Sequence, residues 1–117
     1  MKIRITVGAT ALTATLEDNA AAADFALQLP LTTTLEDYAS TEKIAYLPGK
    51  LTTAGAPPGM SPSVADIAYY APWGNLAVFH RDARHADGLV KLGRIDSGIE
   101  AFQVRGPLRV TIERMEG

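Results

Sequence analysis

The sequence predicts a β-rich domain with one helix. Short runs of β-branched and aromatic residues recur along the chain, and turns rich in Gly, Pro, Asn and Asp separate them. The densest part is residues 66–95, which holds three such runs, the one Trp, both His residues and four of the 11 Lys and Arg residues. In contrast, residues 20–29 are rich in Ala and predict a helix.

Composition fits a single domain that spans residues 1–117. The chain is 47% hydrophobic, and a chain of this length buries roughly two-thirds of its unfolded surface on folding. A net charge of −2 argues against general attraction to nucleic acid or to anionic membranes. With no Cys, the fold has no disulfides and no thiolate metal ligands. The absence of a long apolar window predicts a cytoplasmic protein without a membrane span.

The first elements are two strands and the helix. Apolar and polar residues alternate over residues 2–7 and again over residues 10–16, which predicts two half-buried strands joined by a turn at Gly8. Asp18 or Asn19 can cap the helix over residues 20–29, and Pro30 ends it. We expect the face that contains Phe25 to cover the open end or a face of the sheet.

The remaining strands follow in short runs separated by turns. We predict strands over residues 31–38, 43–47, 66–70, 75–79, 89–95 and 108–115. Residues 51–64 contain three Pro and two Gly residues and predict a long surface loop. A second loop, residues 80–88, carries charged side chains between two strands, and residues 99–104 predict a single helical turn.

The order of these elements resembles that of the cyclophilin family. The clearest local match is residues 87–100, DGLVKLGRIDSGIE, and residues 69–77, YYAPWGNLA, are similar to bacterial single-domain cyclophilin-like proteins of unestablished function. The resemblance implies an all-β, closed or nearly closed barrel of about eight strands with one main helix.

The resemblance does not extend to the signature of cyclophilin prolyl isomerases. That signature begins Phe-His-Arg in the first half of the chain, and no such run lies between Leu31 and Asp66. The run Phe79-His80-Arg81 repeats those three residues at a different place in the barrel. His85 stands where the family has its pocket Trp. Weak prolyl isomerisation, with Arg81 as donor, is therefore an alternative that we expect to be absent.

The leading functional hypothesis is a binding module for a small anionic molecule or a peptide end. Loops between strands can present convergent polar groups above an apolar barrel. The candidate ligand-binding residues are Tyr69, Trp73, His80, Arg81, Arg84 and His85. A structural or protein-interaction role is a further alternative.

Each candidate also has a purely structural interpretation. Three arginines, Arg81, Arg84 and Arg94, can bind an anion through their forked donors, but salt bridges to Asp82, Asp87 or Asp96 are the favoured interpretation. Trp73 is either a ligand anchor or a plug over the hairpin end. Of the adjacent Tyr69 and Tyr70, one ring must face the barrel interior and the other the opposite face.

No metal ion or cofactor is predicted. His80, Asp82, His85 and Asp87 share one loop and are residue types that ligate zinc, but their spacing matches no strong motif. The sequence also contains no phosphate-binding Gly loop and no dinucleotide-binding fingerprint.

Overall fold

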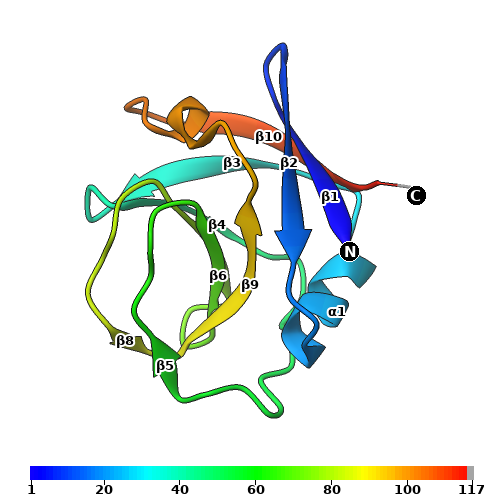
Figure 1. The fold of residues 1–117 in the computed structure, drawn as a ribbon, viewed down its shortest axis with the longest axis vertical. Helices are drawn as coiled ribbons and strands as arrows, with labels where there is room; N and C mark the ends of the chain where they lie inside the picture. Colours follow the sequence, from blue (N-terminus) through cyan, green and yellow to red (C-terminus); the bar gives the residue numbers. More distant parts are fainter. Residues whose placement is uncertain (116–117) are drawn as a thin grey trace.

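Eight antiparallel strands close into a barrel in the computed structural model, which describes residues 1–115 (Figure 1). The closed order is β1 (Lys2–Val7), β10 (Leu108–Arg114), β3 (Leu31–Tyr38), β4 (Glu42–Tyr46), β7 (Asn75–Phe79), β6 (Asp66–Tyr70), β9 (Leu89–Ile95) and β2 (Thr10–Leu16), which pairs with β1 again. The prediction of an all-β barrel with one main helix is confirmed.

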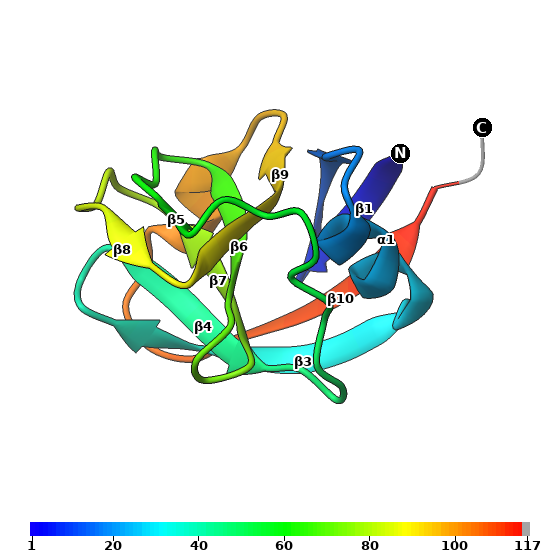
Figure 2. The ribbon, with the colours of Figure 1, turned by 90° about the horizontal axis from the view of Figure 1, so that it is seen from below.

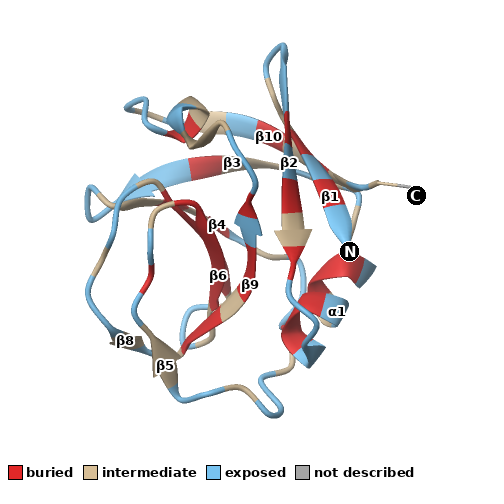
Figure 3. Ribbon diagram, viewed as in Figure 1, coloured by how far each residue is buried: buried red, intermediate tan, exposed pale blue. Residues whose placement is uncertain are grey.

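Alternating side chains from these strands fill the interior of the barrel. Ile3 pairs with Ala14 and Ile5 pairs with Leu12, and all four side chains are buried. Because neighbouring residues on a strand point to opposite faces, this register places one apolar face of each strand inside. The buried positions alternate with exposed ones along β1 and β2 (Figure 3).

The helix α1 (Ala20–Leu27) packs its Phe25 side chain into the same core. It begins after Asn19, whose side-chain oxygen accepts a hydrogen bond of 2.8 Å from the Ala22 amide, as predicted for a cap. It ends two residues before the predicted Leu29. The chain tightens there, with the Gln28 amide donating to the Phe25 carbonyl, and Leu29 precedes a proline, which disfavours the helical conformation.

The long loop contains a short strand that the sequence did not predict. β5 (Gly59–Met60) pairs with β8 (Ala86–Asp87) and joins the two loops that lie beside β6 and β9 (Figure 2). A Cβ atom at Gly59 would lie 2.6 Å from the Ala86 carbonyl oxygen, so glycine permits this close approach. This pairing joins two segments that are distant in the sequence. The local turn residues therefore indicated only a loop.

Other boundaries differ by one or a few residues. β4 begins at Glu42, β10 ends at Arg114, and the predicted helical turn is the 3-10 helix η1 (Ile99–Phe102). Among residues 1–115, no helix is long and apolar enough to cross a membrane.

The strands β6 and β7 are covered on both faces. All five residues of β7 are buried, and so are four of the five in β6. The outward-facing side chains Ala68, Ala77, Phe79 and Leu89 form a second apolar cluster outside the barrel, against Met60, Ala83 and Ala86 of the loops. These loops and the outer faces of β4, β6 and β7 enclose the site described next.

Candidate functional site

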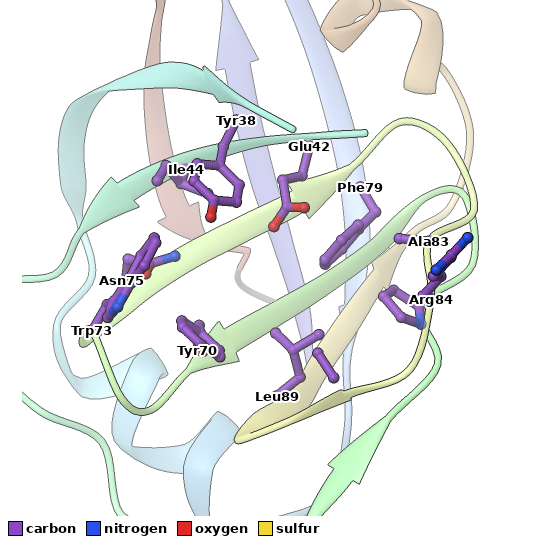
Figure 4. Close-up of a pocket in the computed structure, with 12 residues that line it drawn as sticks. Tyr38, Glu42, Ile44, Tyr70, Trp73, Asn75, Phe79, Ala83, Arg84 and Leu89 are labelled. Carbon is purple, nitrogen blue, oxygen red and sulfur yellow. The ribbon is translucent and has the colours of Figure 1, made fainter. Parts of the chain in front are cut away.

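A cavity of about 190 Å³ lies on the outer face of β4, β7 and β6 (Figure 4). Its lining has an aromatic end, an apolar floor and three polar side chains. The aromatic end is formed by Tyr38, Tyr70 and Trp73, and the apolar floor by Ile44, Phe79 and Leu89. The polar side chains are those of Glu42, Asn75 and Arg84.

Strand register brings these side chains together. Glu42 pairs with Phe79 across β4 and β7, while Tyr70 pairs with Asn75 across β6 and β7 and with Leu89 across β6 and β9. Paired residues present their side chains on the same face of a sheet. The cavity therefore combines side chains from the β6–β7 hairpin with side chains from β4 and β9, which pair with that hairpin on either side.

The two adjacent tyrosines face opposite sides, as the strand pattern predicts. Tyr69 is in the barrel core, 1% exposed, and its hydroxyl oxygen accepts a hydrogen bond of 3.3 Å from the Leu51 amide. Tyr70 points outward and lines the cavity. Of the two, the site candidate named from the sequence, Tyr69, is the one that does not reach the cavity.

Trp73 packs between two tyrosines at the aromatic end. Its ring centroid lies 5.4 Å from that of Tyr38 and 5.3 Å from that of Tyr70, with interplanar angles of 90° and 82°. The side chain of Trp73 remains 46% exposed. Trp73 thus forms a wall of the cavity on the outside of the barrel, in the turn between β6 and β7.

Two acceptor groups line the cavity. The carboxylate of Glu42 accepts a hydrogen bond of 3.0 Å from the Thr41 hydroxyl, and burial raises the pKa of Glu42 above its ordinary value. Asn75 is 1% exposed, and its amide nitrogen donates to the Leu76 carbonyl at 3.1 Å. The side-chain oxygen of Asn75 is buried and has no hydrogen-bond partner in the described protein.

Arg84 approaches the cavity from the end opposite Trp73 (Figure 4). Within residues 1–115, no ion pair forms between Arg84 and an acidic side chain. The salt bridges expected from the sequence between these arginines and Asp82, Asp87 or Asp96 are replaced by other pairs. Asp96 pairs with Lys2, and Arg94 pairs with Asp66. Arg84 is therefore an exposed cation at the rim of an apolar site.

His80 and Arg81 line a separate, larger hollow of about 500 Å³. Arg105 and Asp37 lie in the same hollow. The Nδ1 atom of His80 is buried without a hydrogen-bond partner in the described chain. Burial, followed by the charges of Lys43 and Arg81, lowers the pKa of His80.

His85 lies outside both hollows. Its Nε2 atom is 3.1 Å from an Asp87 carboxylate oxygen, beside the β5–β8 pair. Asp82 accepts a hydrogen bond of 2.8 Å from the Val64 amide. In the described part of the chain, no three His, Asp or Glu side chains group together in a way that could hold a metal ion.

The six sequence candidates are thus divided among four places. Trp73 and Arg84 line the cavity, His80 and Arg81 line the second hollow, His85 is at the short sheet, and Tyr69 is in the core. The sequence reasoning missed Tyr38, Glu42 and Asn75, and of the two adjacent tyrosines it named Tyr69 although Tyr70 lines the cavity. One signal was present, since the apolar residues of β6 and β7 run consecutively instead of alternating, which is typical of strands covered on both faces.

Comparisons with known proteins agree with this architecture. No curated protein matches the chain. The chain is similar to the solution structure of a hypothetical protein from Archaeoglobus fulgidus, with a TM-score of 0.68 and 21% sequence identity, over 98% of this chain and 95% of that one. At this identity the likeness shows the fold alone. The model of the cyclophilin-like family matches residues 5–113, and the chain therefore belongs to the cyclophilin-like family.

Proposed function

We propose that this protein is a binding module that holds a small molecule or a peptide side chain in the outer cavity. The observation that carries the proposal is Asn75, a residue of the cavity lining whose buried side-chain oxygen lacks a hydrogen-bond partner in the described chain. Leaving a buried acceptor unpaired costs about 1–3 kcal/mol, and a ligand donor would remove that cost. Apolar cavities with a few convergent polar groups are typical ligand sites.

The size of the cavity limits the ligand. A volume of about 190 Å³ is below the range of roughly 300–1,000 Å³ that is typical of sites for drug-sized molecules. This supports a compact molecule, or one side chain of a peptide whose backbone lies along the exposed rings of Tyr38 and Trp73. The peptide form of the proposal includes a role in binding another protein.

Binding is favoured over catalysis. Prolyl isomerisation requires a donor aimed at the twisted amide beside an apolar pocket. Arg81, the candidate donor, lines the second hollow and not the apolar cavity. We therefore expect no acceleration of isomerisation in a proline-containing tetrapeptide.

A small anion is the second candidate ligand, and it would occupy the second hollow. The arginine pair Arg81 and Arg105 and the unpartnered Nδ1 atom of His80 support it. In this case the ligand would be held by exposed cations and would bind more weakly as salt increases.

One titration series tests both candidates. We would record backbone amide NMR spectra of the labelled protein with a fragment library, a proline-containing tetrapeptide, acetate and inorganic phosphate. We expect at least one organic ligand to move the signals of Glu42, Phe79 and Leu89. Ala83→Trp, which fills the cavity, should abolish these changes, whereas Ala23→Trp on the exposed face of α1 should not.

The contradicting results are distinct. Signal changes that survive Ala83→Trp would place the ligand elsewhere and overturn the proposal. Changes confined to His80, Arg81 and Arg105 with phosphate or acetate would make the second hollow the site. If no ligand in the series moves any signal, neither candidate stands.

A further inference from the structure

We infer that the aromatic end of the cavity binds a protonated alkylammonium group. This inference rests on the binding function proposed for the cavity, and it adds the chemical class of the ligand. It is carried by three features of the lining: perpendicular aromatic rings, an acidic side chain without a cationic partner, and an unpaired acceptor.

The rings come from two segments, β3 and the β6–β7 hairpin. Tyr38 is at the end of β3, Tyr70 is at the end of β6, and Trp73 is in the turn that follows (Figure 4). Trp73 stands at 90° to Tyr38 and at 82° to Tyr70, with ring centroids 5.4 and 5.3 Å apart. All three residues line this end of the cavity, and a cation placed over the face of an aromatic ring, within about 6 Å of its centroid, is attracted to that face.

The carboxylate of Glu42 lies beside these rings and points into the cavity (Figure 4). No lysine, arginine or histidine among residues 1–115 forms an ion pair with Glu42. Its one hydrogen-bond donor is the neutral hydroxyl of Thr41. A partly buried carboxylate without a counter-ion favours a ligand that brings a positive charge.

Asn75 adds a requirement for an N–H or O–H donor. Its amide nitrogen donates to the Leu76 carbonyl, and its buried side-chain oxygen is left without a hydrogen-bond partner in the described chain. A quaternary ammonium has no hydrogen to donate to this oxygen. A protonated amine brings both a positive charge, which suits the rings and Glu42, and an N–H donor, which suits Asn75, whereas a neutral alcohol or an anion brings no positive charge.

Arg84 does not oppose this assignment, because it enters from the far end of the cavity (Figure 4). A ligand that carried an anionic group some distance from its ammonium group would meet both ends. Glu42 is the charged side chain beside the aromatic end. A substitution of Arg84, the charged side chain of opposite sign at the far end, therefore serves as the matched control.

The test is an NMR titration with four probes of similar size at constant ionic strength and pH 7: n-butylammonium, tetramethylammonium, 1-butanol and butyrate. We expect n-butylammonium to bind about tenfold more tightly than 1-butanol, with butyrate the weakest. Tetramethylammonium should lie between the amine and the alcohol, because it has the charge without the donor.

Three variants separate the contributions. Glu42→Gln should weaken both ammonium probes about tenfold and leave 1-butanol unchanged. Asn75→Leu should weaken n-butylammonium and not tetramethylammonium. Tyr38→Leu, at a partly exposed ring, should weaken both cations and provides a second test if Asn75→Leu does not fold.

The inference is overturned if n-butylammonium and 1-butanol bind equally well, or if Arg84→Gln weakens the cations as much as Glu42→Gln does. Equal binding of all four probes at the cavity signals would leave the binding function in place while rejecting the ammonium class. Organic ligands that bind without moving any cavity signal would reject the binding function itself.

Discussion

Asp96 shows how one side chain holds several elements of the barrel. Its carboxylate accepts hydrogen bonds of 2.8 Å from Lys2, Thr13 and Thr15. These residues belong to β1 and β2, whereas Asp96 directly follows β9. The carboxylate therefore joins three neighbouring strands at one end of the barrel.

This network makes stability depend on pH. The hydrogen bond from Lys2, followed by that from Thr15, lowers the pKa of Asp96 from 3.8 to about 2. A lowered pKa in the folded state adds stability above the unfolded pKa, and that stability is lost as the pH falls from about 4 to about 2. Because the side chain is 30% exposed, solvent screening limits the contribution to about 1 kcal/mol.

Chemical unfolding of the wild type and of Asp96→Asn between pH 2 and pH 6 measures this contribution. We expect the variant to be less stable at pH 6 and the difference to vanish near pH 2. Asp18→Asn, at an exposed carboxylate, should leave the pH profile of the wild type unchanged. Parallel profiles for the wild type and Asp96→Asn would contradict the assignment.

At the scale of elements, β9 is held closely between β2 and β6. Gly93 pairs with Leu16 of β2, and a Cβ atom at Gly93 would collide with the Thr15 carbonyl oxygen and lie 3.0 Å from the Leu16 Cα atom. Both of these neighbours are backbone atoms, which cannot move without displacing β2. The strand therefore needs a residue without a side chain at this position.

Gly93→Ala should destabilise the protein by about 2 kcal/mol, because the added methyl group forces the backbones of β9 and β2 apart. Denaturant unfolding with a constant m-value provides the measurement. Gly49→Ala is the control, since Gly49 is exposed and its nearest neighbour would be the end of the Gln28 side chain at 3.4 Å. If the two variants are equally stable, the backbone of β2 moves aside at little cost in free energy, and the prediction is wrong.

At the scale of the whole molecule, the barrel is closed by the last strand of the chain. β10 pairs with β1 over residues 110–114 and with β3 over residues 108–112, and it joins the two ends of the sheet. Figure 1 shows β10 and β1 side by side although they lie at opposite ends of the sequence. Without β10, two long edges would expose unpaired backbone groups and the apolar interior.

A chain that ends at Pro107 should therefore lose its cooperative thermal unfolding transition and the dispersion of its amide NMR signals. Adding a synthetic peptide of residues 108–115 should restore both, because the missing strand then pairs with β1 and β3 again. If the shortened chain unfolds cooperatively by itself, closure by β10 is not required for folding.

The sequence alone determined the order of the elements and most of their boundaries. Alternation in β1 and β2, the cap at Asn19 and the proline after α1 are local signals, because they depend on backbone conformation and on side-chain period within a few residues. The prediction that the strands close into a barrel came from the family resemblance, which is clearest over residues 87–100. These predictions required no knowledge of which strands are neighbours.

The tertiary structure decided the site. Glu42 lies opposite Phe79 because of the register of β4 with β7, and Tyr70 lies opposite Leu89 because of the register of β6 with β9. Register between strands that are distant in sequence is a property that local patterns do not specify. Trp73 precedes β7 whereas His80 and Arg81 follow it, so they lie at opposite ends of this strand and line different hollows although the three are close in sequence. The β5–β8 pair likewise forms between two loops that were each predicted to be irregular, since its hydrogen bonds join residues almost thirty positions apart.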